Sequence, residues 1–269
     1  MSYVISSSYK TNSSIMKDVI KLIESHVRRT GIDRHRGLES LLDYLLDMFD
    51  MRHFMTADGF CRNIEEARAR DGDLFSIALI WMEKVSDTMD MGRSLDFFGG
   101  VYEEMYQSKG KASTLGQFFT PESLCECMSR LVYSGHEDTG GRINDCACGS
   151  GRTLISHFMA SGNMKGYYIG EDIDTMSVKM CALNMMIHGM RGRVVRHDTL
   201  RDPIYFDYGF EINEVRYPFP TNFYSVRKIS HRKPETIVKP VIKPVIKPVV
   251  KPVVMENSHK STSTQLELF

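Results

Sequence analysis

The sequence lacks long apolar runs, is poor in cysteine and has no excess of either charge. No apolar stretch approaches the roughly 18 residues that a membrane-spanning helix requires, which excludes an integral membrane protein. The first eight residues contain no basic segment followed by an apolar core, which argues against a secretory signal. Six cysteines in 269 residues are too few for a disulfide scaffold, so we expect a protein of the reducing cytoplasm.

The formal net charge of zero hides an uneven distribution. Residues 227–269 contain nine basic and three acidic side chains, whereas the remaining residues contain 25 basic and 31 acidic ones. The body of the protein is therefore mildly acidic and its tail basic. An acidic body argues against a large nucleic-acid surface on that part of the chain.

Periodicity divides the chain into three predicted regions, with boundaries at 1–112, 113–232 and 233–269. In the first region apolar residues recur at helical spacing and strand-like alternation is absent, which predicts a helical domain. The expected helices lie near residues 15–23, 38–49, 64–70, 74–89 and 96–106. This pattern alone is typical of a helical bundle without chemistry of its own.

The middle region alternates between strand and helix patterns. Residues 142–147, 166–172 and 192–198 read as strands, and residues 152–160 and 174–188 read as helices between them. This order predicts an α/β fold with a parallel sheet and crossover helices.

The last region is of low complexity. Four repeats of Lys-Pro-Val followed by Ile or Val fill residues 239–254. Proline at every fourth position excludes a helix or a central strand, so we interpret this region as a disordered, extended spacer. A basic peptide that contacts DNA phosphates is the alternative.

The segment Asp145-Cys-Ala-Cys-Gly-Ser-Gly151 carries the sharpest signal. A strand that enters a Gly-x-Gly turn before a helix lets a ligand approach bare backbone, and the helix N-terminus favours negative charge. The segment lacks the third glycine of the dinucleotide fingerprint, so a simple helix-entry turn is the alternative.

Carboxylates follow the other two predicted strands. Asp172 ends the second strand, where a carboxylate can accept hydrogen bonds from ribose hydroxyls, and Asp198 ends the third, where it could accept one from an adenine amine. Asp174 could share the role of Asp172 or cap the following helix. Open α/β sheets bind ligands at the carboxyl ends of their strands, so we expect these side chains to face one crevice.

These segments together resemble the cofactor motifs of adenine-specific DNA methyltransferases, and most closely those of the modification (methylase) subunit of type I restriction-modification systems. The resemblance covers about residues 90–200. It rests on the segments Asp96-Phe-Phe-Gly-Gly-Val-Tyr-Glu103, Gly116-Gln-Phe-Phe-Thr-Pro121, Asp145-Cys-Ala-Cys-Gly-Ser-Gly151, Gly170-Glu-Asp-Ile-Asp174 and His197-Asp-Thr-Leu200. It implies an N-terminal helical domain followed by a partial Rossmann-like methyltransferase sheet.

The resemblance further implies S-adenosylmethionine as cofactor, with ten contributing residues. Those that would close over its methionine end are Phe118, Phe119, Thr120 and Pro121. Those that would form the loop beneath it are Asp145, Cys148, Gly149 and Gly151, while Asp172 would hold the ribose and Asp198 the adenine amine. The sequence departs from the family at Cys146, usually proline, and at His197, usually glycine, to which we assign no role of its own.

The family's catalytic motif, Asn, Asp or Ser followed by Pro-Pro and an aromatic residue, is missing, because the sequence contains no Pro-Pro. In that motif the polar side chain and a proline carbonyl orient the target amine, and the aromatic ring stacks on a flipped base. The candidates for a non-standard catalytic site are Asn213, Tyr217, Pro218 and Phe219. The alternative is that Tyr217, Phe219, Phe223 and Tyr224 pack over an open sheet edge. Few residues follow Asp198 before the repeats, so the sheet is expected to be truncated.

The cysteine pairs Cys125-x-Cys127 and Cys146-x-Cys148 lack the spacing of zinc knuckles. Side chains two positions apart on a helix point to different faces, so we predict ordinary reduced thiols and no metal.

The final residues Gln265, Leu266, Leu268 and Phe269 are similar to the peptide by which bacterial replication and repair proteins bind the sliding clamp. Apolar anchors on a long tether suit such a partner, and a frayed terminus is the alternative.

Two hypotheses follow. The chain is a methyltransferase that acts on the adenine amine in DNA, or it is a non-catalytic S-adenosylmethionine-binding module of a DNA modification or mobile-element system, tethered to the sliding clamp. The implied partners are DNA and a specificity or restriction subunit.

Overall fold

The computed structural model describes residues 12–54, 59–107, 119–132, 140–201, 206–214 and 224–230. All of them belong to one compact unit, Met1–His231. The predicted spacer, the terminal peptide and the boundary predicted near residue 112 lie outside the described residues. No described helix combines the length and apolarity needed to cross a membrane.

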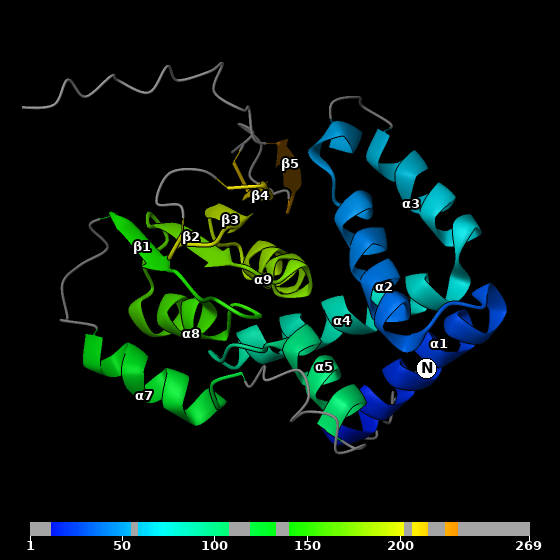
Figure 1. Ribbon diagram of the computed structural model, residues 1–269, viewed down its shortest axis with the longest axis horizontal. Coiled ribbons are helices and arrows are strands. Elements are labelled where there is room, and N and C mark those ends of the chain that lie inside the picture. The colour runs from blue at the N-terminus through cyan, green and yellow to red at the C-terminus, as the bar shows by residue number, and fades with distance from the viewer. Residues whose placement is uncertain are drawn as a thin grey trace, which may run out of the picture. The chain divides into compact units, whose positions relative to one another are not determined.

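The helices expected in the first region are present (Figure 1). They are α1 (Asn12–Thr30), α2 (Arg34–Met48), the short 3₁₀ helix η1 (Met51–Phe54), α3 (Gly59–Arg70), α4 (Gly72–Asp90) and α5 (Phe97–Gln107). Their apolar faces meet around Trp81 of α4, whose ring centroid lies 5.2 Å from that of Phe98 and 6.0 Å from that of Phe49. Burial of these large aromatic side chains supplies much of the local hydrophobic stabilisation.

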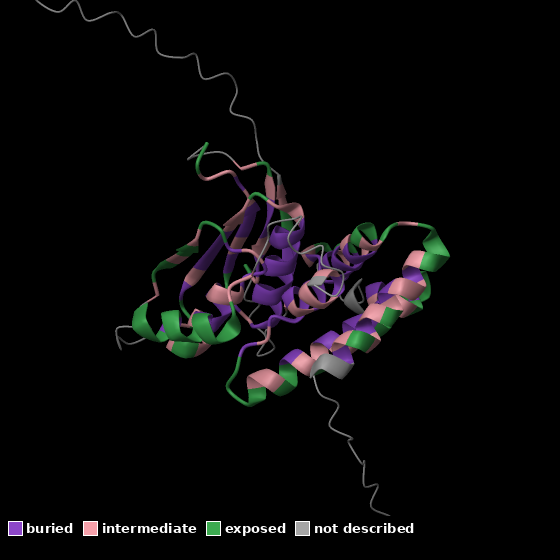
Figure 2. Cartoon of the chain, turned by 60° about the horizontal axis from the view of Figure 1, so that its bottom comes forward, coloured by how far each residue is buried: buried purple, intermediate pink, exposed green. Residues whose placement is uncertain are grey.

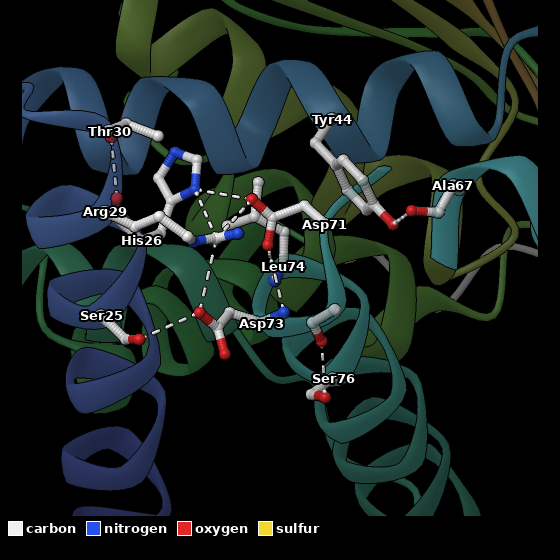
Figure 3. A network of polar contacts seen from close by, with 11 residues as sticks. Ser25, His26, Arg29, Thr30, Tyr44, Ala67, Asp71, Asp73, Leu74 and Ser76 are labelled. Atoms are coloured by element: carbon white, nitrogen blue, oxygen red, sulfur yellow. Dashed lines mark hydrogen bonds and ion pairs between the residues drawn. The ribbon is translucent and has the colours of Figure 1, made fainter. Parts of the chain in front are cut away.

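A buried carboxylate joins α1 to α4 (Figure 3). Asp71 is the N-cap of α4, and one of its oxygens accepts from the backbone N–H of Leu74 at 3.1 Å. Its other oxygen lies 2.8 Å from His26 Nδ1 and 2.7 Å from Arg29 Nη2. Burial alone would raise the pKa of Asp71, but these hydrogen bonds and the positive charge of Arg29 hold it below its ordinary value.

The sheet has five strands in the order β1-β2-β3-β4-β5. β1 (Arg142–Asp145), β2 (Tyr167–Asp172) and β3 (Gly192–Arg196) are parallel, which confirms the prediction from the sequence. β4 (Tyr208–Ile212) and β5 (Val226–Ser230) follow as an antiparallel extension that the sequence analysis does not predict. The sheet is therefore mixed, and β1 forms one of its edges.

The helices α8 (Arg152–Ser161) and α9 (Thr175–Ile187) lie on the same side of the sheet (Figure 1), as right-handed crossovers between neighbouring parallel strands require. α7 (Glu122–Val132) packs against α8. Every residue of α9 from Met176 to Ile187 is buried, so it is drawn purple along nearly its whole length in Figure 2. It contacts α2 and α5 on one side and β2, β3 and β4 on the other, and so joins the helical region to the sheet.

Candidate functional site

The carboxyl ends of β1, β2 and β3 are fastened together beyond the strands themselves. The N–H of Cys148, in the loop after β1, donates to Glu171 O at 2.9 Å. The N–H of His197, directly after β3, donates to Asp172 O at 2.8 Å. The structure therefore places Asp145, Asp172 and Asp198 at or just beyond the carboxyl ends of neighbouring strands, while the single crevice expected from the sequence stays a prediction.

The loop between β1 and α8 depends on two glycines. Gly149 and Gly151 have φ of +53° and +87°, a region that side chains with a Cβ rarely adopt. A Cβ on Gly151 would lie 2.7 Å from Cys181 Sγ, and one on Gly149 would lie 3.0 Å from the Phe119 ring. The loop thus packs closely on both sides. Gly151 is buried and Gly149 is only partly exposed, so the backbone is less accessible than the sequence analysis expects.

Asp172 holds the loop through its side chain. Oδ2 accepts from the N–H of Gly149 at 2.9 Å, and Oδ1 accepts from the N–H of Asp174 at 2.9 Å. A carboxylate has roughly four acceptor sites, so both oxygens keep capacity for a ligand. Asp174 itself is the N-cap of α9 and accepts from Ser177 N–H at 2.8 Å. Of the two roles predicted for Asp174, the structure shows helix capping.

Asp145 is a half-buried carboxylate with little compensation. It accepts from the N–H of Ala147 at 3.1 Å. Burial raises its pKa, and the negative charge of Asp172 adds to the effect. A cation placed beside Asp145 would remove this penalty, so the site is electrostatically suited to a positively charged ligand group.

Asp198 follows β3, and its side chain is partly exposed. Its Oδ1 accepts from Arg201 N–H at 3.2 Å, and its Oδ2 forms an ion pair with Arg201 Nε at 3.4 Å. The neighbouring His197, to which the sequence analysis gives no role, is buried and lies 3.0 Å from Glu171 Oε1 through Nδ1.

The segment before α7 lies over the loop. The Phe119 ring contacts Gly149 and stands edge-on to Tyr102, with centroids 5.5 Å apart. Thr120 O accepts from Arg152 Nη1 at 3.0 Å, and Pro121 O accepts from the N–H groups of Leu124 and Cys125 in the first turn of α7. Phe118 lies outside the described residues.

The N-6 DNA Methylase family model matches residues 93–240, which is more than half of the chain. The chain belongs to this family. The chain is also similar to the type I restriction enzyme MpnII methylase subunit of Mycoplasma pneumoniae, at 27% identity over 208 residues, and to the type I restriction enzyme MjaIX methylase subunit of Methanocaldococcus jannaschii, at 28% identity over 152 residues.

These matches cover 70% and 53% of this chain but only 37% and 26% of the two relatives, so this chain spans well under half of their length. A solved methyltransferase subunit of a type I restriction-modification system from Streptococcus thermophilus superposes with a TM-score of 0.39 and 16% identity, over 73% of this chain and 60% of that one. A superposition at that score is too loose to transfer residues.

Asn213 does not lie at the candidate site. Asn213 follows β4. The last residue of β4, Ile212, pairs with Gly192, the first residue of β3, so Asn213 lies beside the amino end of β3, away from the carboxyl ends of the parallel strands. Its Nδ2 donates to Met186 O at 3.0 Å and to Met190 O at 2.9 Å, and its Oδ1 accepts from Ser225 N–H at 2.9 Å. The amide ties the end of α9 to the sheet, which does not fit the predicted catalytic role.

The other predicted catalytic residues, Tyr217, Pro218 and Phe219, lie outside the described residues. So do the terminal residues Gln265, Leu266, Leu268 and Phe269.

The cysteines divide between buried and exposed positions. On α7, Cys125 is buried and Cys127 exposed, which confirms that they occupy different faces. Cys148 is buried in the loop, where a hydrogen bond with Cys181 and burial raise its pKa well above the ordinary value. Within the described part of the chain, no group of three or more His, Cys, Asp or Glu side chains is arranged to hold a metal ion.

The sequence analysis assigns no role to the residues behind the loop, which centre on Asp96. The Asp96 carboxylate accepts hydrogen bonds from Ser150 Oγ, Arg152 Nε and Asn184 Nδ2, at 2.5, 2.9 and 2.7 Å. Asp96 also accepts from the N–H of Gly99 at 2.9 Å, which makes it the N-cap of α5. The signal that could reveal it is the Asp-x-x-Gly spacing, because a Cβ on Gly99 would lie 2.0 Å from Asp96 Oδ2.

Proposed function

We propose that this chain binds S-adenosylmethionine at the carboxyl ends of β1, β2 and β3. The observation that carries the proposal is the arrangement of Asp145 and Asp172 around a bare glycine loop, with Asp198 beyond them. S-adenosylmethionine combines cationic sulfonium and ammonium groups with ribose hydroxyls and an adenine amine, and this edge offers an acceptor for each kind of group.

The proposed contacts follow the chemistry of each side chain. Asp145 and the loop of Cys148, Gly149 and Gly151 would hold the cationic methionine end, beside the half-buried Asp145 carboxylate, whose pKa is raised by burial and by the negative charge of Asp172. The remaining acceptor capacity of Asp172 would take the ribose hydroxyls. Asp198 would accept from the adenine amine, and the segment from Phe118 to Pro121 would cover the site. When bound, S-adenosylmethionine supplies an electrophilic methyl group.

Isothermal titration calorimetry with S-adenosylmethionine tests this proposal. We expect wild-type protein to bind, and Asp172→Asn to raise Kd by at least tenfold, on the order of the 1.4 kcal/mol that one charge-assisted interaction contributes. Asp47→Asn is the matched control, because Asp47 is a surface carboxylate that pairs with Arg70 at 2.9 Å, away from this edge. Absence of wild-type binding at millimolar ligand would refute the proposal.

We further propose that the bound methyl group is transferred to the exocyclic amine of adenine in DNA. Membership of the N-6 DNA methylase family supports this reaction. Candidates to orient the target base are Tyr217, Pro218 and Phe219. The test is incorporation of labelled methyl groups into DNA of mixed sequence, followed by nucleoside analysis for N6-methyladenine.

One observation favours a second candidate function, a cofactor-binding module that does not catalyse transfer. Asn213, the amide predicted to present the target base, is held by three backbone partners at the far edge of the sheet. In this case the protein would bind S-adenosylmethionine but would incorporate no label into any DNA. Binding with turnover would exclude it.

We propose DNA and the specificity and restriction subunits of a type I restriction enzyme as partners, in the cytoplasm. The support is that both relatives are named methylase subunits of such enzymes. Co-expression with candidate specificity subunits and size-exclusion chromatography tests the assembly, and separate elution at micromolar concentration would contradict it.

The terminal peptide remains a separate proposal. Gln265, Leu266, Leu268 and Phe269 would bind a bacterial sliding clamp, with residues 239–254 as the tether. Pull-down of a purified clamp should be lost on deletion of residues 265–269, and retention after the deletion would disprove the contact.

A further inference from the structure

The carboxylate of Asp96 lies behind the glycine loop and is almost fully buried. It receives hydrogen bonds from four donors that belong to three parts of the chain, namely α5, the loop with the start of α8, and α9. Ser150 of the loop is 1% exposed and Asn184 of α9 is fully buried, so water cannot substitute for these contacts. A charged acceptor with several buried donors is among the stronger arrangements in a protein interior.

Arg152 extends this contact to the segment above the loop. Its Nε donates to Asp96 at 2.9 Å, while its Nη1 and Nη2 donate to Glu103 of α5 at 3.3 and 3.1 Å. Nη1 also donates to Thr120 O at 3.0 Å. One planar guanidinium therefore connects α5, the start of α8 and the Phe119–Pro121 segment, which lysine could not do because it lacks the fork of donors.

The lower side of the network is closed by α9. Asn184 Nδ2 donates both to Asp96 and to Ser150 O, at 2.7 and 2.8 Å. His188, one turn later, donates from Nδ1 to Asn184 O at 2.7 Å and accepts from Leu95 N–H at 3.3 Å through Nε2. These bonds hold the backbone N–H of Leu95, next to Asp96, and the backbone carbonyl of Ser150 against α9.

We propose that Asp96 and Arg152 are positioning residues for the glycine loop, and that they hold it in the conformation that binds S-adenosylmethionine. This inference rests on the proposed function. Gly149 and Gly151 have no side chains of their own to fix the loop, and ordering backbone costs roughly 1–2 kcal/mol per residue. The network orders the loop when the protein folds, so ligand binding does not have to supply the free energy for that ordering.

A buried ion pair also stabilises the fold, so the experiment needs a control of the same kind elsewhere. Lys179 of α9 donates to Glu39 and Asp43 of α2, both at 2.9 Å. It is as buried as Arg152 and likewise joins the helical region to the sheet region, but it does not contact the loop. Lys179→Met therefore removes a comparable ion pair without changing the support of the loop.

The experiment compares Asp96→Asn, Arg152→Lys and Lys179→Met with the wild type. Urea denaturation gives the loss of stability of each variant, calorimetry gives its Kd for S-adenosylmethionine, and hydrogen exchange gives the protection of amides 148–151 without ligand. We expect Asp96→Asn and Arg152→Lys to raise Kd tenfold or more and to speed loop exchange. Lys179→Met should lose stability but keep the Kd and the loop protection of the wild type.

Each other outcome overturns the proposal. Wild-type affinity in both loop-network variants would show that the loop orders without them. An equal rise of Kd in Lys179→Met, at equal stability, would show a general effect of destabilisation. If the wild type binds no S-adenosylmethionine, the proposed function fails, and loop exchange still tests the inference: protection in Asp96→Asn equal to that in Lys179→Met would refute it. Should Asp96→Asn fail to fold, Arg152→Lys alone provides the comparison.

Discussion

Replacing Gly151 with alanine tests how the loop is built, because the structure predicts two separate costs. With φ at +87° and ψ at 11°, Gly151 has a left-handed conformation, which costs a residue with a Cβ roughly 1–2 kcal/mol. The new Cβ would also lie 2.7 Å from Cys181 Sγ and 3.3 Å from Cys181 Cα. Overpacking of this kind costs typically about 1–3 kcal/mol, because α9 is buried and cannot move aside. The two costs together predict a loss of about 2–5 kcal/mol.

Gly162 separates the two costs. It ends α8 with φ of +62°, yet a Cβ there would meet nothing within 4 Å. Gly162→Ala should therefore lose only the conformational part, about 1–2 kcal/mol. Urea denaturation monitored by circular dichroism gives both values, and an unchanged slope would confirm that the folded state alone is affected.

A double-mutant cycle identifies the contact itself. Cys181→Ala removes the sulfur that the new Cβ would meet, so Gly151→Ala should cost less in that background than in the wild type. The reasoning is refuted if Gly151→Ala is no more destabilising than Gly162→Ala, or if its cost is the same with and without the sulfur.

Three further perturbations follow from the structure. Asn213→Ala should destabilise the protein by about 2–4 kcal/mol in thermal or urea unfolding, because it removes three hydrogen bonds and leaves alanine at φ of +50°. A neutral effect would contradict the role of Asn213 in joining α9 to the sheet. The pKa of Asp71 is held below its ordinary value in the folded state, so this carboxylate should contribute stability above about pH 4 that is lost as the pH falls through the lowered pKa; melting of Asp71→Asn from pH 3 to 7 should therefore show a weaker acid dependence than the wild type. Leu131→Lys, at a side chain 79% exposed on α7, should raise solubility in ammonium sulfate precipitation without lowering the melting temperature.

The local features of the fold can be predicted from the sequence. The three parallel strands, the helices between them and the glycine loop all follow from periodicities and turn residues within short windows. The capping role of Asp174 remains open at that stage, because a carboxylate after a strand can serve either a ligand or a helix. Its extended backbone and the bond from Ser177 N–H show the cap.

The strand β4 is missed for an identifiable reason. Tyr208, Phe210 and Ile212 alternate with Gly209 and Glu211, which is a strand pattern. The sequence analysis considers this part of the chain only for a catalytic motif and names Asn213, directly after the strand, as a candidate.

The support of the loop could not be predicted because it is non-local. Asp96 is separated by 54 residues from Ser150 and by 88 from Asn184. No periodicity links such positions, and only the folded chain brings their donors to one carboxylate. The same holds for Asn213, whose polar side chain suggests chemistry until its three backbone partners are known.

β1 lies at the border of the sheet, and its carboxyl end carries Asp145 of the candidate site. Gly141 O accepts from Tyr167 N–H, so by alternation the backbone groups of Arg142 and Asn144 face outward, and within the described ranges no strand pairs with them. A strand from another chain that paired with this border would end beside Asp145. If the proposed S-adenosylmethionine site and this border were coupled, the coupling would be reciprocal. An added strand would change the affinity for S-adenosylmethionine by the same factor by which S-adenosylmethionine changes the affinity for the strand.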